Sequence, residues 1–369
     1  MSSNLDAGSA KAAAENDRAP ITSEPGSAAD RPGVSGDAPG GVTGDHADPS
    51  HRVRGASRPA AAIVAVVVTL QALLIAMFAW PAINMAPRDL PVIVAAPPEA
   101  AAAVAERLTS VRPGAFKVST VADEDAATRA LRDRRAYAAF VVRPDGPRLL
   151  VASAASPAIA QLFAQQAQTI GGGQPIPVVD VIPSTSGDPR GAGFAAGFLP
   201  LILTSMVVGI LLATLVPSKG ARLAAVGSFS LLAGLAGAAV LQYWLDVLSG
   251  PYLRNAAVIG LLALAVCGAV AGLAALLGPA GIAIAVLLIF LVGNPLSAVA
   301  SAPEMLPQPW GAIGQLLPPG AGATLLRSSA FFDGAGGAAA LWTLSAWATA
   351  GLVFLLVGRR RAGHGLGAG

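Results

Sequence analysis

The sequence is poor in charge, cysteine and histidine. Charged residues make up 12% of the 369 residues, whereas soluble domains average about 25%. The single cysteine, Cys267, lies inside an apolar run, so a disulfide within one chain is impossible. The three histidines, His46, His51 and His364, lie far from the apolar runs at 192–295. These absences argue against a histidine-dependent metal site or catalytic triad.

Two motif classes are also missing. No Gly-x-x-x-x-Gly-Lys-Ser/Thr sequence occurs, so this chain is not expected to bind ATP through a P-loop. Its basic residues form no patch interleaved with aromatic residues, the pattern that would indicate nucleic-acid binding. We therefore expect neither an enzyme nor a nucleic-acid-binding protein, and we expect no cofactor.

Long apolar runs are the dominant feature, and hydrophobic residues make up 54% of the chain. Four runs follow one another: 197–216, 223–241, 256–277 and 282–292. The charged residues between positions 192 and 295 all fall in the gaps: Lys219, Arg222, Asp246 and Arg254. A soluble amphipathic helix keeps a polar face, which these runs lack. Since a bilayer needs about 20 apolar residues of helix, the fourth run needs adjoining residues to complete a span.

Two further runs, at 59–81 and 338–357, raise the expected number of transmembrane helices to six. Basic residues near membrane ends favour the cytoplasmic side. Those expected on that side are Arg52, Arg54, Arg58, Lys219, Arg222, Arg359, Arg360 and Arg361. The short outer segments carry only Arg88, Arg254 and Arg327. This distribution of charge predicts a multi-pass protein with both termini cytoplasmic. The composition, rich in Ala, Gly and Arg, is typical of a GC-rich bacterial genome and so favours the plasma membrane of a bacterium.

The remaining segments have soluble character. Residues 1–57 contain no aromatic residue, which predicts a disordered cytoplasmic tail, and residues 358–369 form a basic cytoplasmic tail. Between helix 1 (59–82) and the five-helix membrane domain (192–357), residues 85–190 alternate strand-like and helical segments. This alternation predicts a small α/β domain with partly parallel strands. The expected fold is a membrane all-α bundle of six transmembrane helices with a small α/β extracytoplasmic domain between helices 1 and 2.

Residues 295–335 are apolar but broken by proline and glycine. Five prolines after Pro295 forbid one long helix: Pro303, Pro307, Pro309, Pro318 and Pro319. Short helices are expected at 310–317 and 323–332, with a break at 320–322. Such a segment predicts a re-entrant or interfacial outer hairpin, whose irregular backbone must be buried in protein or line a watery cavity.

Pairs of glycines four residues apart, Gly193 with Gly197 and Gly268 with Gly272, allow helix backbones to approach closely. They predict either helix packing within the chain or the seam of a homodimer.

Three motifs together resemble a known family. Gly-Asn-Pro at 293–295 is followed by W-x-x-I-G-x-x-L-P-P-G-A-G at 310–322 and F-F-D-G-A-G at 331–336. This series resembles the last extracytoplasmic segment of type-2 ABC-transporter permeases, in particular the phage-infection-protein-like branch, and the similarity covers about residues 59–358. The family's architecture is similar: one helix, an extracytoplasmic domain and five more helices.

The resemblance implies roles for particular residues. Those that match the family pattern either shape the outer gate or only fix the fold of the hairpin: Gly293, Asn294, Pro295, Trp310, Pro318, Pro319, Gly320, Asp333 and Gly334. The turn at 217–222, with Lys219 and Arg222, matches the place where such permeases contact their ATPase.

The resemblance also implies a function. It is that of an integral membrane permease subunit of an ABC-type exporter, which moves an amphipathic or lipid-like substrate with a separate cytoplasmic ATPase. The chain would work in the lipid bilayer as a homodimer or heterodimer. The alternative is a non-transporting membrane scaffold or receptor that acts through its extracytoplasmic domain.

Overall fold

The computed structural model describes residues 50–170 and 176–358. Residues 1–49 and 359–369, which make up most of the tails expected at 1–57 and 358–369, lie outside the described residues. The chain divides into two compact units, residues 1–60 and 61–369. Apart from the start of helix α1, all the described helices and strands belong to the second unit. Helix α1 begins at Ser50, nine residues before the start predicted at residue 59. An existing helix lengthens at little cost, because each added residue adds one hydrogen bond.

The α/β region, residues 90–182, alternates strands and helices close to the predicted positions. Its elements are β1 (Leu90–Ala95), α2 (Pro98–Val111), β2 (Phe116–Val121), α3 (Glu124–Arg132), β3 (Ala138–Arg143), β4 (Gly146–Val151), α4 (Pro157–Ile170) and β5 (Val178–Asp180). The strand order is β2-β1-β3-β4-β5. Neighbouring strands are parallel except for the antiparallel pair β3–β4. The prediction of a small sheet with partly parallel pairing is confirmed.

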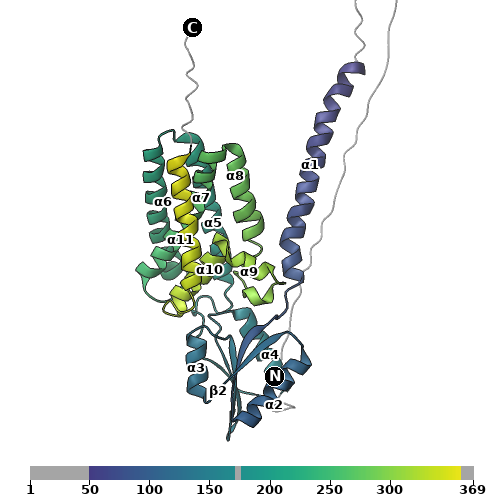
Figure 1. Cartoon of the computed structure of the whole chain (residues 1–369), viewed down its shortest axis with the longest axis vertical. Coiled ribbons are helices and arrows are strands. Elements are labelled where there is room, and N and C mark those ends of the chain that lie inside the picture. Colours follow the sequence, from purple (N-terminus) through teal and green to yellow (C-terminus); the bar gives the residue numbers. More distant parts are fainter. Residues whose placement is uncertain (1–49, 171–175, 359–369) are drawn as a thin grey trace, which may run out of the picture. The chain divides into compact units, whose positions relative to one another are not determined.

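Strand β1 is buried on both faces because helices cover the sheet from both sides. Leu90 and Val92 belong to one apolar core with Phe163 of α4. Ile93 belongs to a second core with Leu131 of α3. Figure 1 shows α3 on one side of the sheet and α2 and α4 on the other. Crossover helices on both faces are the expected consequence of parallel pairing.

All regular secondary structure in the rest of the described chain is helical. Its elements are α1 (Ser50–Ile83), α5 (Ala192–Leu215), α6 (Lys219–Ala239) with the π-helical η1 (Val240–Trp244), α7 (Tyr252–Leu277), α8 (Pro279–Val286) with the π-helical η2 (Leu287–Gly293), the 3-10 turn η3 (Pro303–Met305), α9 (Trp310–Gln315), α10 (Pro318–Phe331) and α11 (Ala338–Val357). Helices α5, α6, α7, α8 and α11 run alongside one another, and α9 and α10 lie toward one end of them (Figure 1).

Five helices in the described residues are long and apolar enough to cross a membrane: Ala60–Ile83, Ala192–Leu215, Lys219–Trp244, Tyr252–Leu277 and Ala338–Val357. The segment expected to supply a sixth span is the shorter apolar helix Pro279–Gly293. At 1.5 Å per residue it is about 22 Å long, less than the roughly 30 Å of a bilayer core.

Helix α7 lies at the centre of the bundle and touches its neighbours through glycine. A Cβ on Gly272 would meet the carbonyl oxygen of Gly351 in α11, and one on Gly234 of α6 would meet that of Ala256. Gly197 of α5 faces Leu241, whose side chain lies 2.8 Å from where its Cβ would be. Gly272 and Gly197, one member of each predicted pair, therefore pack helices within the chain, the first of the two predicted readings.

A buried carboxylate caps α5. Asp188, 7% exposed, accepts hydrogen bonds from the backbone N–H groups of Gly193 (3.0 Å) and Phe194 (2.7 Å). These donors have no partner inside the helix, and the helix dipole favours a negative charge there.

We expect Asp188→Ala to lower the free energy of unfolding by about 1–2 kcal/mol, because two N–H groups lose their acceptor. Denaturant unfolding of the detergent-solubilised protein measures the change. The control is Asp125→Ala, an exposed aspartate of α3, for which we expect less than about 0.5 kcal/mol. Equal effects of the two variants would contradict the capping role.

Candidate functional site

The candidate site is the predicted hairpin, residues 295–335, with the residues that adjoin its two ends. Its longer helix, α10, is buried along almost its whole length. Helix α9 forms where a short helix was predicted, but the predicted break at 320–322 is wrong, because α10 is helical from Pro318 onward. Prolines in the first turn of a helix remove no backbone hydrogen bond, because the N–H groups there have no partner within the helix.

The glycines of α10 do not break the helix; they allow other parts of the chain to pack closely against it. A Cβ on Gly320 would collide with the carbonyl oxygen of Gly314 in α9, and one on Gly322 would lie 2.7 Å from Leu262 of α7. A Cβ on Gly314 would in turn collide with the carbonyl of Leu296. The hairpin backbone is thus folded tightly on itself and against the bundle, as the prediction of a buried irregular segment requires.

Arg327 places a guanidinium inside the bundle. The residue is 6% exposed, its Nη2 donates to the carbonyl of Val299 (2.9 Å), and its Cζ lies 4.6 Å from the ring centroid of Phe194 in α5. Arg327 belongs to the segment where a short helix was predicted at 323–332, and it lies in the buried helix α10. A buried charge is costly unless it is bonded, so this side chain ties α10 to α5 and to the loop before α9.

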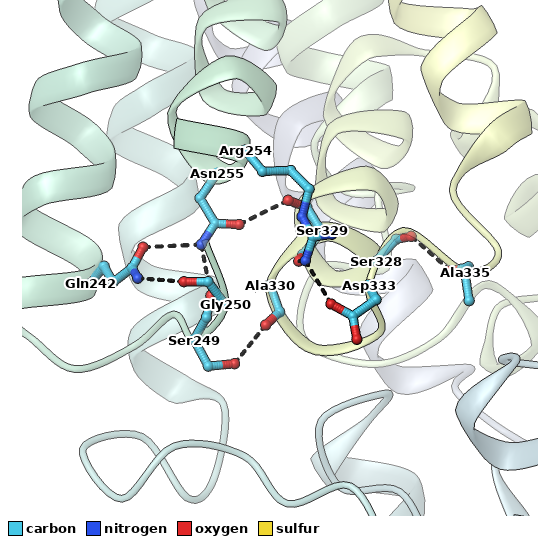
Figure 2. Close-up of polar contacts among 10 residues, drawn as sticks. All are labelled: Gln242, Ser249, Gly250, Arg254, Asn255, Ser328, Ser329, Ala330, Asp333 and Ala335. Atoms are coloured by element: carbon cyan, nitrogen blue, oxygen red, sulfur yellow. Dashed lines mark hydrogen bonds and ion pairs between the residues drawn. The ribbon is translucent and has the colours of Figure 1, made fainter. Parts of the chain in front are cut away.

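A polar network holds the C-terminal end of α10 (Figure 2). At its centre is Asn255 of α7, which is fully buried. Its Nδ2 donates to Gln242 Oε1 (3.1 Å) and to the carbonyl of Ser249 (2.7 Å), and its Oδ1 accepts from Ser329 Oγ (2.9 Å). Ser249 Oγ donates to the carbonyl of Ala330 (2.6 Å). The network joins the end of η1, the start of α7 and the last turn of α10.

Two of the predicted gate residues, Asp333 and Gly334, form the turn that ends α10. Both have left-handed backbones, with φ of 49° and 93°, and the N–H of Gly334 donates to the carbonyl of Ser328 (2.9 Å), as at many helix C-termini. Asp333 accepts from Arg254 Nη2 (2.9 Å), but its side chain is 96% exposed, so the ion pair contributes little to stability.

The other predicted gate residues gather at the opposite end of α10. A Cβ on Gly293 would lie 3.0 Å from Pro319, the carbonyl of Asn294 accepts from Ser297 Oγ (2.7 Å), and Trp310 packs edge-on against Trp80 at 6.4 Å. Pro318 and Gly320 lie in the first turn of α10, and Pro295 comes two residues after the end of η2. The motif residues therefore form two groups, one at each end of α10, about 20 Å apart along a helix of 14 residues.

The α/β region contacts the hairpin through two polar side chains. Nη1 of Arg134 donates to the carbonyl of Thr324 in α10 (3.1 Å), and its guanidinium lies 5.3 Å from the ring centroid of Phe332. The hydroxyl of Tyr137 donates to Glu304 Oε2 (2.9 Å). Burial raises the pKa of Tyr137, which keeps its hydroxyl protonated as a donor, and burial lowers the pKa of Arg134 from its very high ordinary value.

The predicted ATPase-contact residues bind helix ends. Arg222, 9% exposed, donates from Nε to the carbonyl of Val216 (2.6 Å) and from Nη2 to that of Ala213 (3.1 Å) at the end of α5. Lys219 Nζ donates to the carbonyl of Leu356 near the end of α11 (2.9 Å). Basic groups are favourable at helix C-termini. Both side chains thus stabilise this end of the bundle, and the exposed surface of the turn includes Gly220.

Within the described residues, no group of three or more His, Cys, Asp or Glu side chains is arranged to hold a metal ion. Comparison with protein families, with curated proteins and with solved structures finds no match for this chain.

Proposed function

We propose that this chain is the permease subunit of an ABC-type exporter in the bacterial plasma membrane. It spans the bilayer six times, with the short helix Pro279–Gly293 as one of the crossings, and keeps both termini in the cytoplasm. It moves an amphipathic or lipid-like substrate outward, driven by a separate cytoplasmic ATPase, as a homodimer or heterodimer.

One observation supports this proposal above the others: the apolar segment 294–337 is broken into the short helices α9 and α10, and α10 is buried and bonded to the bundle by polar side chains. Broken helices at membrane depth are tolerated where protein buries them or a watery cavity borders them, and transporters use them to build substrate paths. The contact of Arg134 with Thr324 of α10 offers a route by which the α/β region can sense the state of α10.

The topology is tested with single cysteines, since the native Cys267 is buried. Exposed positions are available on every proposed side: Ala103, Gly220, Ala280 and Ala300. We expect a membrane-impermeant thiol reagent to label Ala103→Cys and Ala300→Cys in intact cells, but Gly220→Cys and Ala280→Cys only after lysis. Labelling of Ala280→Cys and Ala300→Cys from the same side would remove the short helix from the list of crossings.

The ATPase is tested by capture of the chain from its native membranes in mild detergent. We expect a protein with ATPase activity to co-purify, and Gly220→Trp to weaken that association because the indole obstructs the turn at 217–222. Ala103→Trp, on the exposed face of α2, is the matched control. If no ATPase co-purifies and deletion of residues 90–182 abolishes every phenotype of the chain, the receptor alternative replaces the exporter.

A further inference from the structure

A pocket of about 350 Å³ lies between the α/β region and the hairpin. Its size falls in the range of roughly 300–1,000 Å³ usual for small-molecule sites. Its wall carries charges of both signs, the guanidinium of Arg134 and the carboxylate of Glu304. Among the described residues no ion pair within 4.0 Å joins these two groups, so each retains bonding capacity for a third group.

Both charges are held in place by the protein. Arg134 is fixed by its bond to the carbonyl of Thr324 and by the ring of Phe332. That bond uses one of the five N–H donors of a guanidinium. Glu304 is fixed by the hydroxyl of Tyr137, which bonds Oε2 only. A ligand would therefore meet a cation and an anion already in position, which lowers the entropic cost of binding.

The same pocket has an apolar wall. Leu316, Ala339 and Ala340 line it, and Leu316 is 65% exposed. The two alanines lie in the first turn of α11, one of the helices long and apolar enough to cross a membrane. The charged groups are thus adjacent to the end of a membrane-length helix, where the headgroup of a lipid would lie.

We propose that this pocket binds a zwitterion with an anionic group and a primary ammonium group, the chemistry of the phosphatidylethanolamine headgroup. The phosphate accepts hydrogen bonds from the remaining N–H groups of Arg134, and the ammonium donates to the carboxylate of Glu304. Free phosphoethanolamine has the same chemistry, but only the lipid also covers the apolar wall. The inference goes beyond export and holds whether or not an ATPase is the partner.

Native mass spectrometry of the detergent-solubilised full chain tests the site with three lipids of matched acyl chains. We expect phosphatidylethanolamine to bind more tightly than phosphatidylcholine, whose quaternary ammonium has no N–H, and phosphatidylglycerol, which has no cation. Competition by free phosphoethanolamine would assign the site to the soluble zwitterion, and no competition would assign it to the lipid. Equal binding of the three lipids, without binding of phosphoethanolamine, would overturn the proposal.

Substitutions at the two charges should have different effects. Arg134→Gln should weaken phosphatidylethanolamine binding about tenfold or more, because the anion loses charge-assisted hydrogen bonds, and Arg134→Lys should restore part of it. Glu304→Gln should instead abolish the preference for phosphatidylethanolamine over phosphatidylglycerol. Arg135→Gln, at an exposed neighbour paired with Asp133, is the control and should change nothing. A thermal unfolding curve for each variant separates lost binding from lost folding, and a retained preference in folded Glu304→Gln would refute the assignment.

Discussion

Gly351→Ala is expected to disrupt the crossing of α7 and α11 and to lower the free energy of unfolding by about 3 kcal/mol, the upper part of the range for overpacking. The added Cβ would lie 2.6 Å from the backbone nitrogen of Ala269 and would also collide with the backbone of Gly268. Backbone atoms in the middle of a packed helix cannot rotate away as a side chain can. The two helices would have to separate, which exposes or distorts the most buried part of the bundle.

The matched control is Gly227→Ala in α6, where an added Cβ meets nothing within 4 Å. Because alanine has a higher helix propensity than glycine, this variant should keep or slightly raise the stability, by up to about 1 kcal/mol. Thermal unfolding and gel filtration in the same detergent compare the two. If Gly351→Ala were as stable and monodisperse as Gly227→Ala, the close approach of α7 and α11 would be wrong.

Hydrophobic pattern alone predicts most of the fold because lipid-length apolar runs have few alternatives. The runs at 59–81, 197–216, 223–241, 256–277 and 338–357 each match a membrane-length helix, and only residues 59 and 216 extend beyond its ends. The alternation of strands and helices in the α/β region was equally predictable, because Pro98, Asp123 and Pro157 mark the starts of helices. The run at 282–292 was ambiguous, since its apolar length was short of a span in the sequence and remains so in the helix Pro279–Gly293.

The candidate site was predicted only in part, because its contacts join segments far apart in the sequence. The Pro-Gly pattern indicated a buried hairpin, but Pro318 and Pro319 looked like breakers where they are a helix start. Arg327 is a single arginine in a largely apolar segment, and only the fold shows that it contacts Phe194 and Val299. The role of Asn255 has no local signal in the sequence, because this residue stands one position before the apolar run that begins at Ala256. No local sequence pattern predicts the hydrogen bond from Arg134 to the carbonyl of Thr324.

The second large effect is expected from Asn255→Asp, which keeps the shape of the side chain and changes only its donors. Nδ2 of Asn255 donates to two oxygens, Gln242 Oε1 and the carbonyl of Ser249. A carboxylate oxygen in that position would face two acceptors, fully buried, with no donor of its own to offer. An uncompensated buried charge costs about 3–5 kcal/mol, so we expect a loss of that size in the free energy of unfolding.

The control for this substitution is Asn84→Asp. Nδ2 of Asn84 also donates to a carbonyl, that of Trp80 (2.9 Å), but the bond is exposed, so water can solvate the new carboxylate and the change should stay below about 0.5 kcal/mol. Ser329→Ala provides the intermediate case, because it removes one donor to Asn255 Oδ1 and should cost about 1 kcal/mol. Limited proteolysis adds a positional readout, since loss of the network should expose the end of α10 before the rest of the bundle opens. If Asn255→Asp and Asn84→Asp lost the same stability, Asn255 would not be the buried centre that holds α10 to α7.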